Sequence, residues 1–156
     1  MVRVSEWMTT PVLSIEVTDS IGRARRIMAE QRINQLPVLD DGRLVGIVTD
    51  RDLRDAYPTS LVINRFREID TFADTYTVEE AMSHSVIVVA PETDLSTAVK
   101  LLRRHRIGAL PVLDKGTLVG ILTRSNVLDF VLSGKILTPK PSRKKRQQKS
   151  VKRKRS

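Results

Sequence analysis

The sequence of 156 residues contains no cysteine and only two histidines, His84 and His105. The missing cysteines exclude a disulfide framework, a thiol nucleophile and a cysteine-based metal site, and two histidines are too few for a histidine-rich metal centre. Long apolar runs are missing too: a stretch such as Val86–Ala90 cannot span a bilayer, and the first residues lack the apolar segment of a signal peptide. We therefore expect a cytoplasmic protein without a transmembrane segment or a metal.

Acidic residues are absent from the C-terminal end, where ten of the 27 Lys and Arg residues lie between Lys140 and Arg155. The other 17 basic residues stand against 18 acidic ones, so the net charge of +9 belongs to this end of the chain. Pro139–Ser156 shows no apolar periodicity, and we expect a disordered basic tail over residues 134–156.

The tail has several possible partners. Its charge density is sufficient to bind nucleic acid by counterion release, without sequence specificity. Anionic lipid or an acidic protein would satisfy the same electrostatics, and in a eukaryote the segment would also act as a nuclear localisation signal. A tail that only solvates the protein is the remaining interpretation.

An internal repeat organises the body of the chain. At an offset of 74 residues, 16 of the 47 positions in residues 8–54 are identical to those in residues 82–128, without a gap. The identities gather around the Leu36–Asp40 and Leu44–Thr49 segments. Self-similarity at one offset indicates two copies of a supersecondary unit, each too small to bury its apolar face alone.

Each copy predicts the order strand, helix, strand, strand, helix. In both copies, capping residues precede apolar residues at helical spacing, and an Asp-Gly or Lys-Gly turn separates the second and third strands. The first copy is expected to contain a strand at 12–15, a helix after Ser20, strands at 36–39 and 44–48, and a helix at 50–57. The second is expected to contain a strand at 86–89, a helix after Asp94, strands at 110–113 and 118–122, and a helix at 124–132 stopped by Gly134.

The segments that carry chemistry are Gly46–Asp52 and Gly120–Asn126. In each, a strand that ends in Thr runs directly into a helix, whose free backbone N–H groups and Thr hydroxyl favour an anion such as phosphate. Three residues later, Asp52 or Asn126 lies on the first helical turn, where a carboxylate or amide can accept from the hydroxyls of a ribose.

The two copies resemble tandem CBS domains, the pair known as a Bateman module. The resemblance rests on Leu-Pro-Val-Leu-Asp at 36–40 and 110–114 and on Gly-x-x-Thr-x-x-Asp/Asn at 46–52 and 120–126, and it covers residues 4–133. It implies an α+β fold in which the repeats, residues 4–57 and 78–133, are joined by a linker at 58–77 and form a pseudo-twofold pair. It also implies homodimers, and two clefts that bind AMP, ADP, ATP or S-adenosylmethionine for regulation.

Carried over residue by residue, the resemblance implies that Thr49 and Thr123 contact phosphate or ribose, while Asp52 and Asn126 hold ribose hydroxyls. Because Asn126 lacks the charge of Asp52, we expect unequal clefts. Arg51 and Arg124 are further candidates for contact with phosphate. The remaining expected cleft residues are Asn34, Gln35, Leu36, Gly108, Ala109 and Leu110, with Thr10, Val12, His84 and Val86 flanking the base.

A purely structural interpretation stands beside this one, because Thr49 and Thr123 could simply cap helices in any repeat protein. The run Arg103–Arg106 is likewise either a solvated helix face or a source of phosphate contacts at a cleft rim. Asp50 and Asp52 point in different directions on a helix and have no nucleophile beside them, so we expect no enzyme activity.

The sequence leaves two functions in competition. The first is a non-enzymatic regulatory module that binds an adenine nucleotide or a related adenosyl ligand and responds by a conformational or dimer change. The second is a nucleic-acid-associated protein in which the repeat pair is a dimerisation scaffold and the basic tail binds the polyanion.

Overall fold

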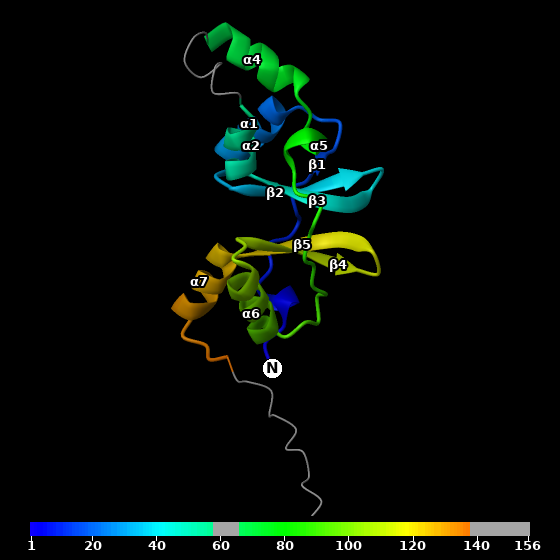
Figure 1. Cartoon of the computed structure of the whole chain (residues 1–156). Helices are drawn as coiled ribbons and strands as arrows, with labels where there is room; N and C mark the ends of the chain where they lie inside the picture. The colour runs from blue at the N-terminus through cyan, green and yellow to red at the C-terminus, as the bar shows by residue number, and fades with distance from the viewer. Residues whose placement is uncertain (58–65, 138–156) are drawn as a thin grey trace, which may run out of the picture.

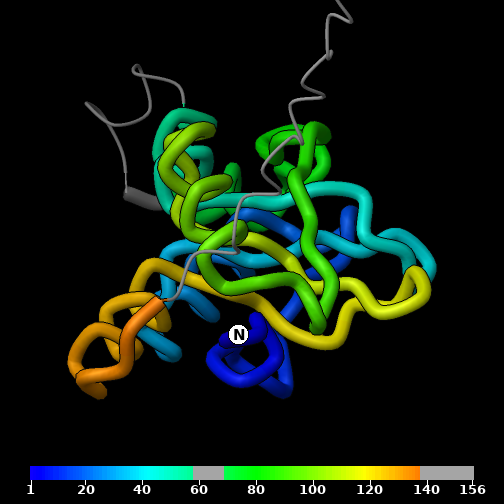
Figure 2. Tube along the Cα trace, turned by 90° about the horizontal axis from the view of Figure 1, so that it is seen from below, coloured from blue at the N-terminus to red at the C-terminus, as the bar shows by residue number. Residues whose placement is uncertain are grey.

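A computed structural model describes residues 1–57 and 66–137. Two antiparallel hairpins lie at its centre, with α1, α2 and α4 on one side and α6 and α7 on the other (Figure 1). Viewed from below, the two hairpins overlap (Figure 2). The elements are a 3-10 helix Val4–Glu6, β1 Ile15–Glu16, α1 Ile21–Gln31, β2 Gln35–Asp40, β3 Arg43–Thr49, α2 Asp50–Ala56, α4 Phe66–Thr75, α5 Val78–Ala81, α6 Leu95–His105, β4 Ala109–Asp114, β5 Thr117–Thr123 and α7 Arg124–Leu132.

The hairpins confirm the expected turns. β2 pairs antiparallel with β3, and β4 pairs antiparallel with β5 in the same register. The two turns place Asp41 and Gly42, or Lys115 and Gly116, at positive φ. This backbone joins two strands through a two-residue turn and tolerates Gly best, which is why an x-Gly pair occupies both turns.

The helices begin where the capping residues predict. The Ser20 side chain accepts a hydrogen bond from Arg23 N at the start of α1, and Asp94 accepts from Ser96 N at the start of α6. Thr49 and Thr123 are the N-caps of α2 and α7. Since each first-turn N–H lacks a partner within its own helix, these side chains fix the residue at which the chain turns.

The first predicted strand of each copy is much shorter than expected. In residues 12–15 only Ile15 joins a strand, and in residues 86–89 only Val89 forms an isolated bridge. The reason is that each segment crosses between the hairpins: residue 9 bridges Ile121 of β5 before residue 15 pairs with Val38 of β2. A chain that changes sheets within a few residues cannot build a long ladder with either.

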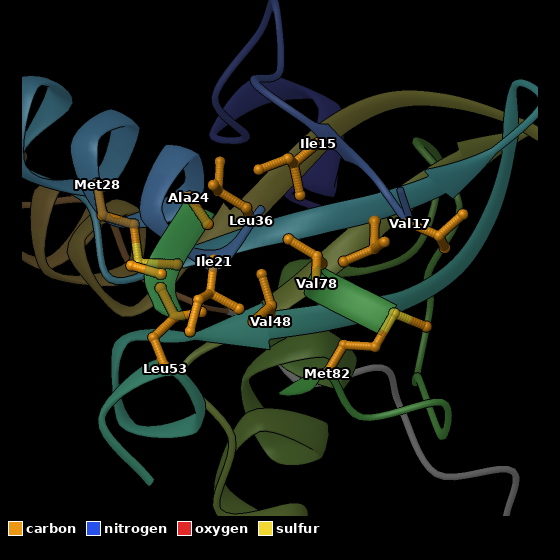
Figure 3. Close-up of a cluster of buried hydrophobic side chains, with 12 residues drawn as sticks. Ile15, Val17, Ile21, Ala24, Met28, Leu36, Val48, Leu53, Val78 and Met82 are labelled. Carbon is orange, nitrogen blue, oxygen red and sulfur yellow. The ribbon is translucent and has the colours of Figure 1, made fainter. Parts of the chain in front are cut away.

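Each hydrophobic core takes residues from both repeats. The first core contains Ile21, Leu36 and Leu53 of the first repeat together with Val78 and Met82 of the second (Figure 3). The second core reciprocally contains Val4 beside Leu95, Leu110, Leu122 and Phe130. The short helix that opens each repeat therefore packs in the opposite lobe, and neither lobe can be completed by one repeat alone.

The expected linker contributes one helix. α4 packs on α1, where a Cβ added to Gly22 would lie 3.1 Å from the Ala73 carbonyl oxygen, and Phe72 stacks on Tyr76 with ring centroids 4.9 Å apart. The linker residues 58–65 and most of the predicted basic tail, residues 138–156, lie outside the described residues. No helix within 1–57 and 66–137 is long and apolar enough to cross a membrane.

Candidate functional site

The first motif is closed on itself at the start of α2. Thr49 Oγ1 accepts from Asp52 N at 3.1 Å, and Asp52 Oδ2 accepts from Thr49 N at 2.9 Å. This reciprocal pair is a capping box, so Thr49 does cap a helix, as the structural interpretation predicted. Only Oδ2 of the Asp52 carboxylate is used in it; among the described residues nothing donates to Oδ1.

The second motif has the same cap, but its Asn126 amide makes more hydrogen bonds than the Asp52 carboxylate makes. Asn126 Oδ1 accepts from Thr123 N at 2.9 Å and from Thr123 Oγ1 at 3.0 Å, and Asn126 Nδ2 donates to Thr9 Oγ1 at 3.1 Å. Both ends of the Asn126 amide are thus engaged by protein atoms. A ligand hydroxyl that donates to Asn126 Oδ1 would have to displace one of these contacts, whereas one that donates to Asp52 Oδ1 would not.

The glycine of each motif allows the opposite repeat to approach. An added Cβ at Gly46 would collide with the Ser83 carbonyl oxygen, and at Gly120 it would meet Met8 Sδ. These contacts bring residues 83–86 to the first motif and residues 9–12 to the second. Each candidate cleft is therefore built from the motif of one repeat and the opening segment of the other.

A cavity of about 350 Å³, the first cleft, lies at the first motif. Ser85, Val86 and Ile87 of the second repeat face Ile47 and Thr49 of the first across it. Apolar walls with a few polar groups are typical of small-molecule sites. The remaining lining residues are Gln35, His105, Arg106, Ile107, Gly108 and Ala109.

A second cavity of about 480 Å³, the central chamber, adjoins the first cleft, and Gln35, Thr49 and Gly108 line both. It lies between the starts of α2 and α7, where Asp50 N donates to Asn34 O and Arg124 N donates to Gly108 O. Its lining residues are Asn34, Gln35, Thr49, Asp50, Arg51, Arg54, Gly108, Thr123, Arg124 and Ser125.

The charges in the chamber differ between the repeats. Arg51 is paired with Asp55 at 3.8 Å and Arg54 with Asp50 at 3.6 Å, but Arg124 has no acidic partner among the described residues. Arg124 is also the first residue of α7, where the positive end of the helix disfavours a cation. The position equivalent to Arg124 in the first repeat holds Asp50, which the same helix end favours.

This inversion makes the chamber electrostatically uneven. The start of α2 carries two carboxylates, Asp50 and Asp52, which offset its positive end. The start of α7 carries no acidic residue in its first turn and adds the Arg124 guanidinium. Negative charge in the chamber is therefore stabilised on the α7 side.

The structure brings only part of the expected site residues together. Asn34, Gln35, Thr49, Arg51, Val86, Gly108, Ala109, Thr123 and Arg124 line the two cavities. Leu36 and Leu110 are fully buried in the two cores, so their side chains line neither. Asp52 and Asn126 are half-buried and hydrogen-bonded to Thr49 and Thr123, and neither is among the residues that line the two cavities. Thr10 Oγ1 donates to Val119 O, Val12 lies in the segment that reaches the second motif, and His84 is exposed beside Ser85.

Ile47 and Ile87 line the first cleft although no motif singled them out. A signal for Ile47 was present, because alternate residues of a strand share a face and Ile47 lies two residues before Thr49. His105 and Arg106, from the basic run, also reach the first cleft. Within residues 1–57 and 66–137, no cluster of acidic residues or histidines could hold a metal ion.

Comparison with known proteins identifies the architecture. The family model for the CBS domain matches twice, at residues 4–59 and 78–133. The chain belongs to the CBS domain family. Its two repeats, the expected α+β fold and the resemblance to a Bateman module are thereby confirmed.

Relatives in the family differ in size. A CBS domain-containing protein of Dictyostelium discoideum is 33% identical over 142 residues, which cover 90% of this chain and 97% of that protein. An inosine-5′-monophosphate dehydrogenase of Korarchaeum cryptofilum is 33% identical over 126 residues, but these cover 80% of this chain and only 23% of the enzyme. CBS pairs thus occur both nearly alone and as parts of enzymes.

Two solved structures of similar fold contain adenosyl ligands. CBSX2, solved in complex with AMP, is 31% identical with a TM-score of 0.71; the match covers 87% of this chain and 100% of that one. The CBS domain pair of protein MJ0100, solved with 5′-methylthioadenosine and S-adenosyl-L-methionine, is 25% identical with a TM-score of 0.71, covering 86% and 99%. Relatives of this fold therefore bind AMP or S-adenosylmethionine.

Proposed function

We propose that the chain is a non-enzymatic regulatory module that binds an adenine nucleotide in the first cleft. The single observation that carries this proposal is the junction of the first cleft with the central chamber at Thr49. The first cleft offers apolar walls for a base, and the chamber offers an unpaired Arg124 for a phosphate. AMP bound by one structural relative is consistent with this ligand class.

The ligand has a definite orientation in this proposal. The base lies between Ile47 and Val86, and a ribose hydroxyl donates to Asp52 Oδ1, the oxygen without a partner in the capping box. The phosphate then points into the chamber, toward Thr123 and Arg124. This places the negative charge beside the start of α7, where the helix and the guanidinium both stabilise it.

Phosphate selects among the adenosyl ligands. Guanidinium groups bind phosphate strongly through paired hydrogen bonds, whereas S-adenosylmethionine carries no phosphate, and its sulfonium and ammonium groups outweigh its one carboxylate, so its net charge is positive. The unpaired Arg124 therefore favours AMP, ADP or ATP over S-adenosylmethionine. The second motif binds more weakly, because Asn126 Oδ1 already accepts two hydrogen bonds from Thr123 and is not free to accept from a ribose hydroxyl.

Regulation follows from the way the lobes are connected. A ligand at the first cleft contacts the motif of one repeat and the opening segment of the other, so its binding biases how the two are held together. The response depends on a state that the ligand prefers. We expect a homodimer, which light scattering on the full chain measures.

A second candidate function belongs to the basic end of the chain. Ten Lys and Arg without an acidic residue, between Lys140 and Arg155, favour nonspecific polyanion binding. Deletion of residues 139–156 separates the functions: polyanion binding should disappear, while nucleotide binding should remain.

The test of the leading proposal is a thermal-shift series with AMP, ADP, ATP, S-adenosylmethionine and adenosine. A ligand that binds only the native state raises the melting temperature by mass action. A saturable shift with a nucleotide, larger than with adenosine or S-adenosylmethionine, is the expected result. No shift with any of the five would contradict the proposal and leave the polyanion function in first place.

A further inference from the structure

Two methionines hold the repeats against each other at equivalent positions. Met8 and Met82 are separated by the repeat offset of 74 residues, and each packs on the motif glycine of the opposite repeat. A Cβ added at Gly120 would lie 2.5 Å from Met8 Sδ, and one added at Gly46 would lie 2.7 Å from the Met82 methyl carbon, Cε. In the second motif the sulfur atom itself therefore meets the glycine, whereas in the first motif the methyl group does.

The methionines of the chain differ in exposure. Met1 is 68% exposed, Met8 is half-buried, Met82 is 8% exposed and Met28 is 5% exposed. Because the sequence has no cysteine, a thioether is the sulfur group that hydrogen peroxide meets on this chain. In the folded protein, Met1 and Met8 are accessible to the oxidant, whereas Met28 and Met82 are protected. Of the two accessible residues, Met8 is the one that packs on the opposite repeat.

We propose that Met8 is a site of reversible oxidation to the sulfoxide. The Sδ lone pair takes one oxygen from hydrogen peroxide, the O–O bond breaks, and the other oxygen leaves as water. The sulfur is thereby oxidised, and the peroxide reduced, by two electrons. A methionine sulfoxide reductase reverses the step by releasing the added oxygen as water while two thiols become a disulfide. This modification requires no nucleotide and so goes beyond the proposed function.

The sulfoxide of Met8 does not fit the contact with Gly120. The thioether is apolar and packs against the second core, whereas the sulfoxide is polar and carries an added oxygen on the atom that meets the glycine. That oxygen only accepts hydrogen bonds, and the neighbouring donors Thr9 N and Ile121 N already donate to each other's carbonyl oxygens, at 2.8 and 3.1 Å. An acceptor without a partner destabilises a packed site, so oxidation should displace Met8.

Displacement of Met8 reaches the second motif through the next residue. Thr9 forms the bridge with Ile121 of β5. The Thr9 side chain also contacts the motif directly, because Thr9 Oγ1 accepts from Asn126 Nδ2 at 3.1 Å. Both contacts require the opening segment to lie against β5. Oxidation of Met8 should therefore loosen the second motif.

The first motif provides an internal control. Ile47 N donates to Ser83 O at 3.1 Å, the same length as the bond from Ile121 N to Thr9 O. The residue before Ser83 is the buried Met82 (Figure 3). Since peroxide does not reach this sulfur in the folded chain, the first motif should stay intact when the second is loosened.

Mass spectrometry on the full chain, treated with hydrogen peroxide and quenched with free methionine, measures where oxidation occurs. Met8 sulfoxide should form at least about tenfold faster than Met82 sulfoxide, because oxidation follows exposure. Hydrogen exchange of the same sample measures the consequence. The Ile121 amide should exchange about tenfold faster after oxidation, while exchange at the Ile47 amide should not change.

Substitutions attribute the effect to Met8. Met8→Leu keeps the apolar volume and removes the sulfur, so peroxide should no longer accelerate exchange at Ile121. Met82→Leu is the matched control and should respond to peroxide as the wild type does. Met8→Gln places a polar side chain at the contact, so it should accelerate exchange at Ile121 without peroxide. Trp7, the only tryptophan, precedes Met8, and its fluorescence should follow the same change.

The modification of Met8 should also be reversible. Methionine sulfoxide reductases for both epimers, with dithiothreitol as the thiol, should restore slow exchange at Ile121. Three results would overturn the proposal: oxidation of Met8 no faster than that of Met82, equal acceleration at Ile121 and Ile47, or acceleration that persists in peroxide-treated Met8→Leu. A melting curve verifies that each untreated variant folds. If Met8→Leu does not fold, Met8→Gln and the comparison of Ile121 with Ile47 decide.

Discussion

The central hairpins of the two repeats are nearly interchangeable, whereas their outer helices are not. Leu36–Asp40 repeats unchanged as 110–114, and both hairpins pair in one register. On the helices, Arg25 corresponds to Val99 and Arg54 corresponds to Leu128. The fold constrains the hairpin from both faces, but it leaves the helix surface free to diverge. The two repeats therefore differ most on their outer helical surfaces.

The starts of α2 and α7 show the same contrast within the site. Asp50 at the start of α2 agrees with the helix dipole, whereas Arg124 at the start of α7 opposes it. Positions that break a local stability rule are expected to be functional or strained. This difference distinguishes the nucleotide-binding interpretation from one in which both motifs only cap helices.

The largest expected effect is on stability, at the two glycines where each hairpin contacts the opening segment of the other repeat. Gly46→Ala should destabilise the protein by about 3 kcal/mol, because its Cβ collides with the backbone oxygen of Ser83. Gly120→Ala should cost about half as much, since its nearest neighbour is the flexible Met8 side chain. Urea denaturation of both variants measures the difference in the free energy of unfolding. Equal losses would mean that the opposite repeat packs equally tightly against the two glycines.

The outer helical face of the first repeat, which α4 covers, and that of the second repeat should respond differently to truncation. Phe72→Ala removes the half-buried ring between Tyr57 and Tyr76 and should destabilise the protein by about 2 kcal/mol. Val131→Ala should change stability by less than about 0.5 kcal/mol, because this side chain is largely exposed. Thermal unfolding of the two variants compares the faces. A large loss at Val131 would mean that its face is already covered in solution.

Substitution of Arg124 in the chamber should weaken the binding of ligands that carry a phosphate and spare those that do not. Arg124→Gln should weaken AMP binding about tenfold, the loss of one charge-assisted contact, and should leave adenosine binding unchanged. Arg51→Gln is the matched control, since Arg51 is 83% exposed and paired with Asp55. Calorimetric titration provides both affinities. If both variants weakened AMP equally, the phosphate would not be held by the α7 side.

The smallest effect concerns the ion pair that accompanies α4. Arg26 and Asp74 are 63% and 64% exposed, so Arg26→Ala should cost no more than about 0.3 kcal/mol. The aromatic contacts, and not this pair, hold the covering helix. A loss above 1 kcal/mol in urea denaturation at low salt, within the range of hydrogen bonds to charged groups, would reverse that order.

The sequence predicted the elements that local interactions decide. The caps at Ser20 and Asp94 and the turns at Gly42 and Gly116 depend on neighbouring residues, and each lies where the pattern placed it. The strands at 12–15 and 86–89 were predicted too long, because their crossing between sheets depends on contacts with the other repeat, of Thr9 with Ile121 and of Ser83 with Ile47. No local pattern contains that information.

The candidate site, like the fold, could be predicted only where local patterns decide it. Thr49 and Thr123 were found from their motifs, but motifs alone could not place Val86 against Ile47 or bring Arg124 beside Thr49. Leu36 and Leu110 adjoin the predicted cleft in sequence, yet strand alternation turns both into the cores. Ile47 could have been predicted from that alternation.

The most direct test of the unequal clefts is calorimetric titration of AMP into the wild type, Asp52→Ala and Asn126→Ala. Each variant loses the side chain that closes its capping box, about 1 kcal/mol in thermal unfolding, and Asn126→Ala also loses the bond to Thr9, so it should be the less stable of the two. The account predicts that Asp52→Ala weakens AMP binding about tenfold or more, as expected for hydrogen bonds to a charged group, while Asn126→Ala leaves the tighter site nearly unchanged. Equal losses of affinity, or no loss in either variant, would contradict it.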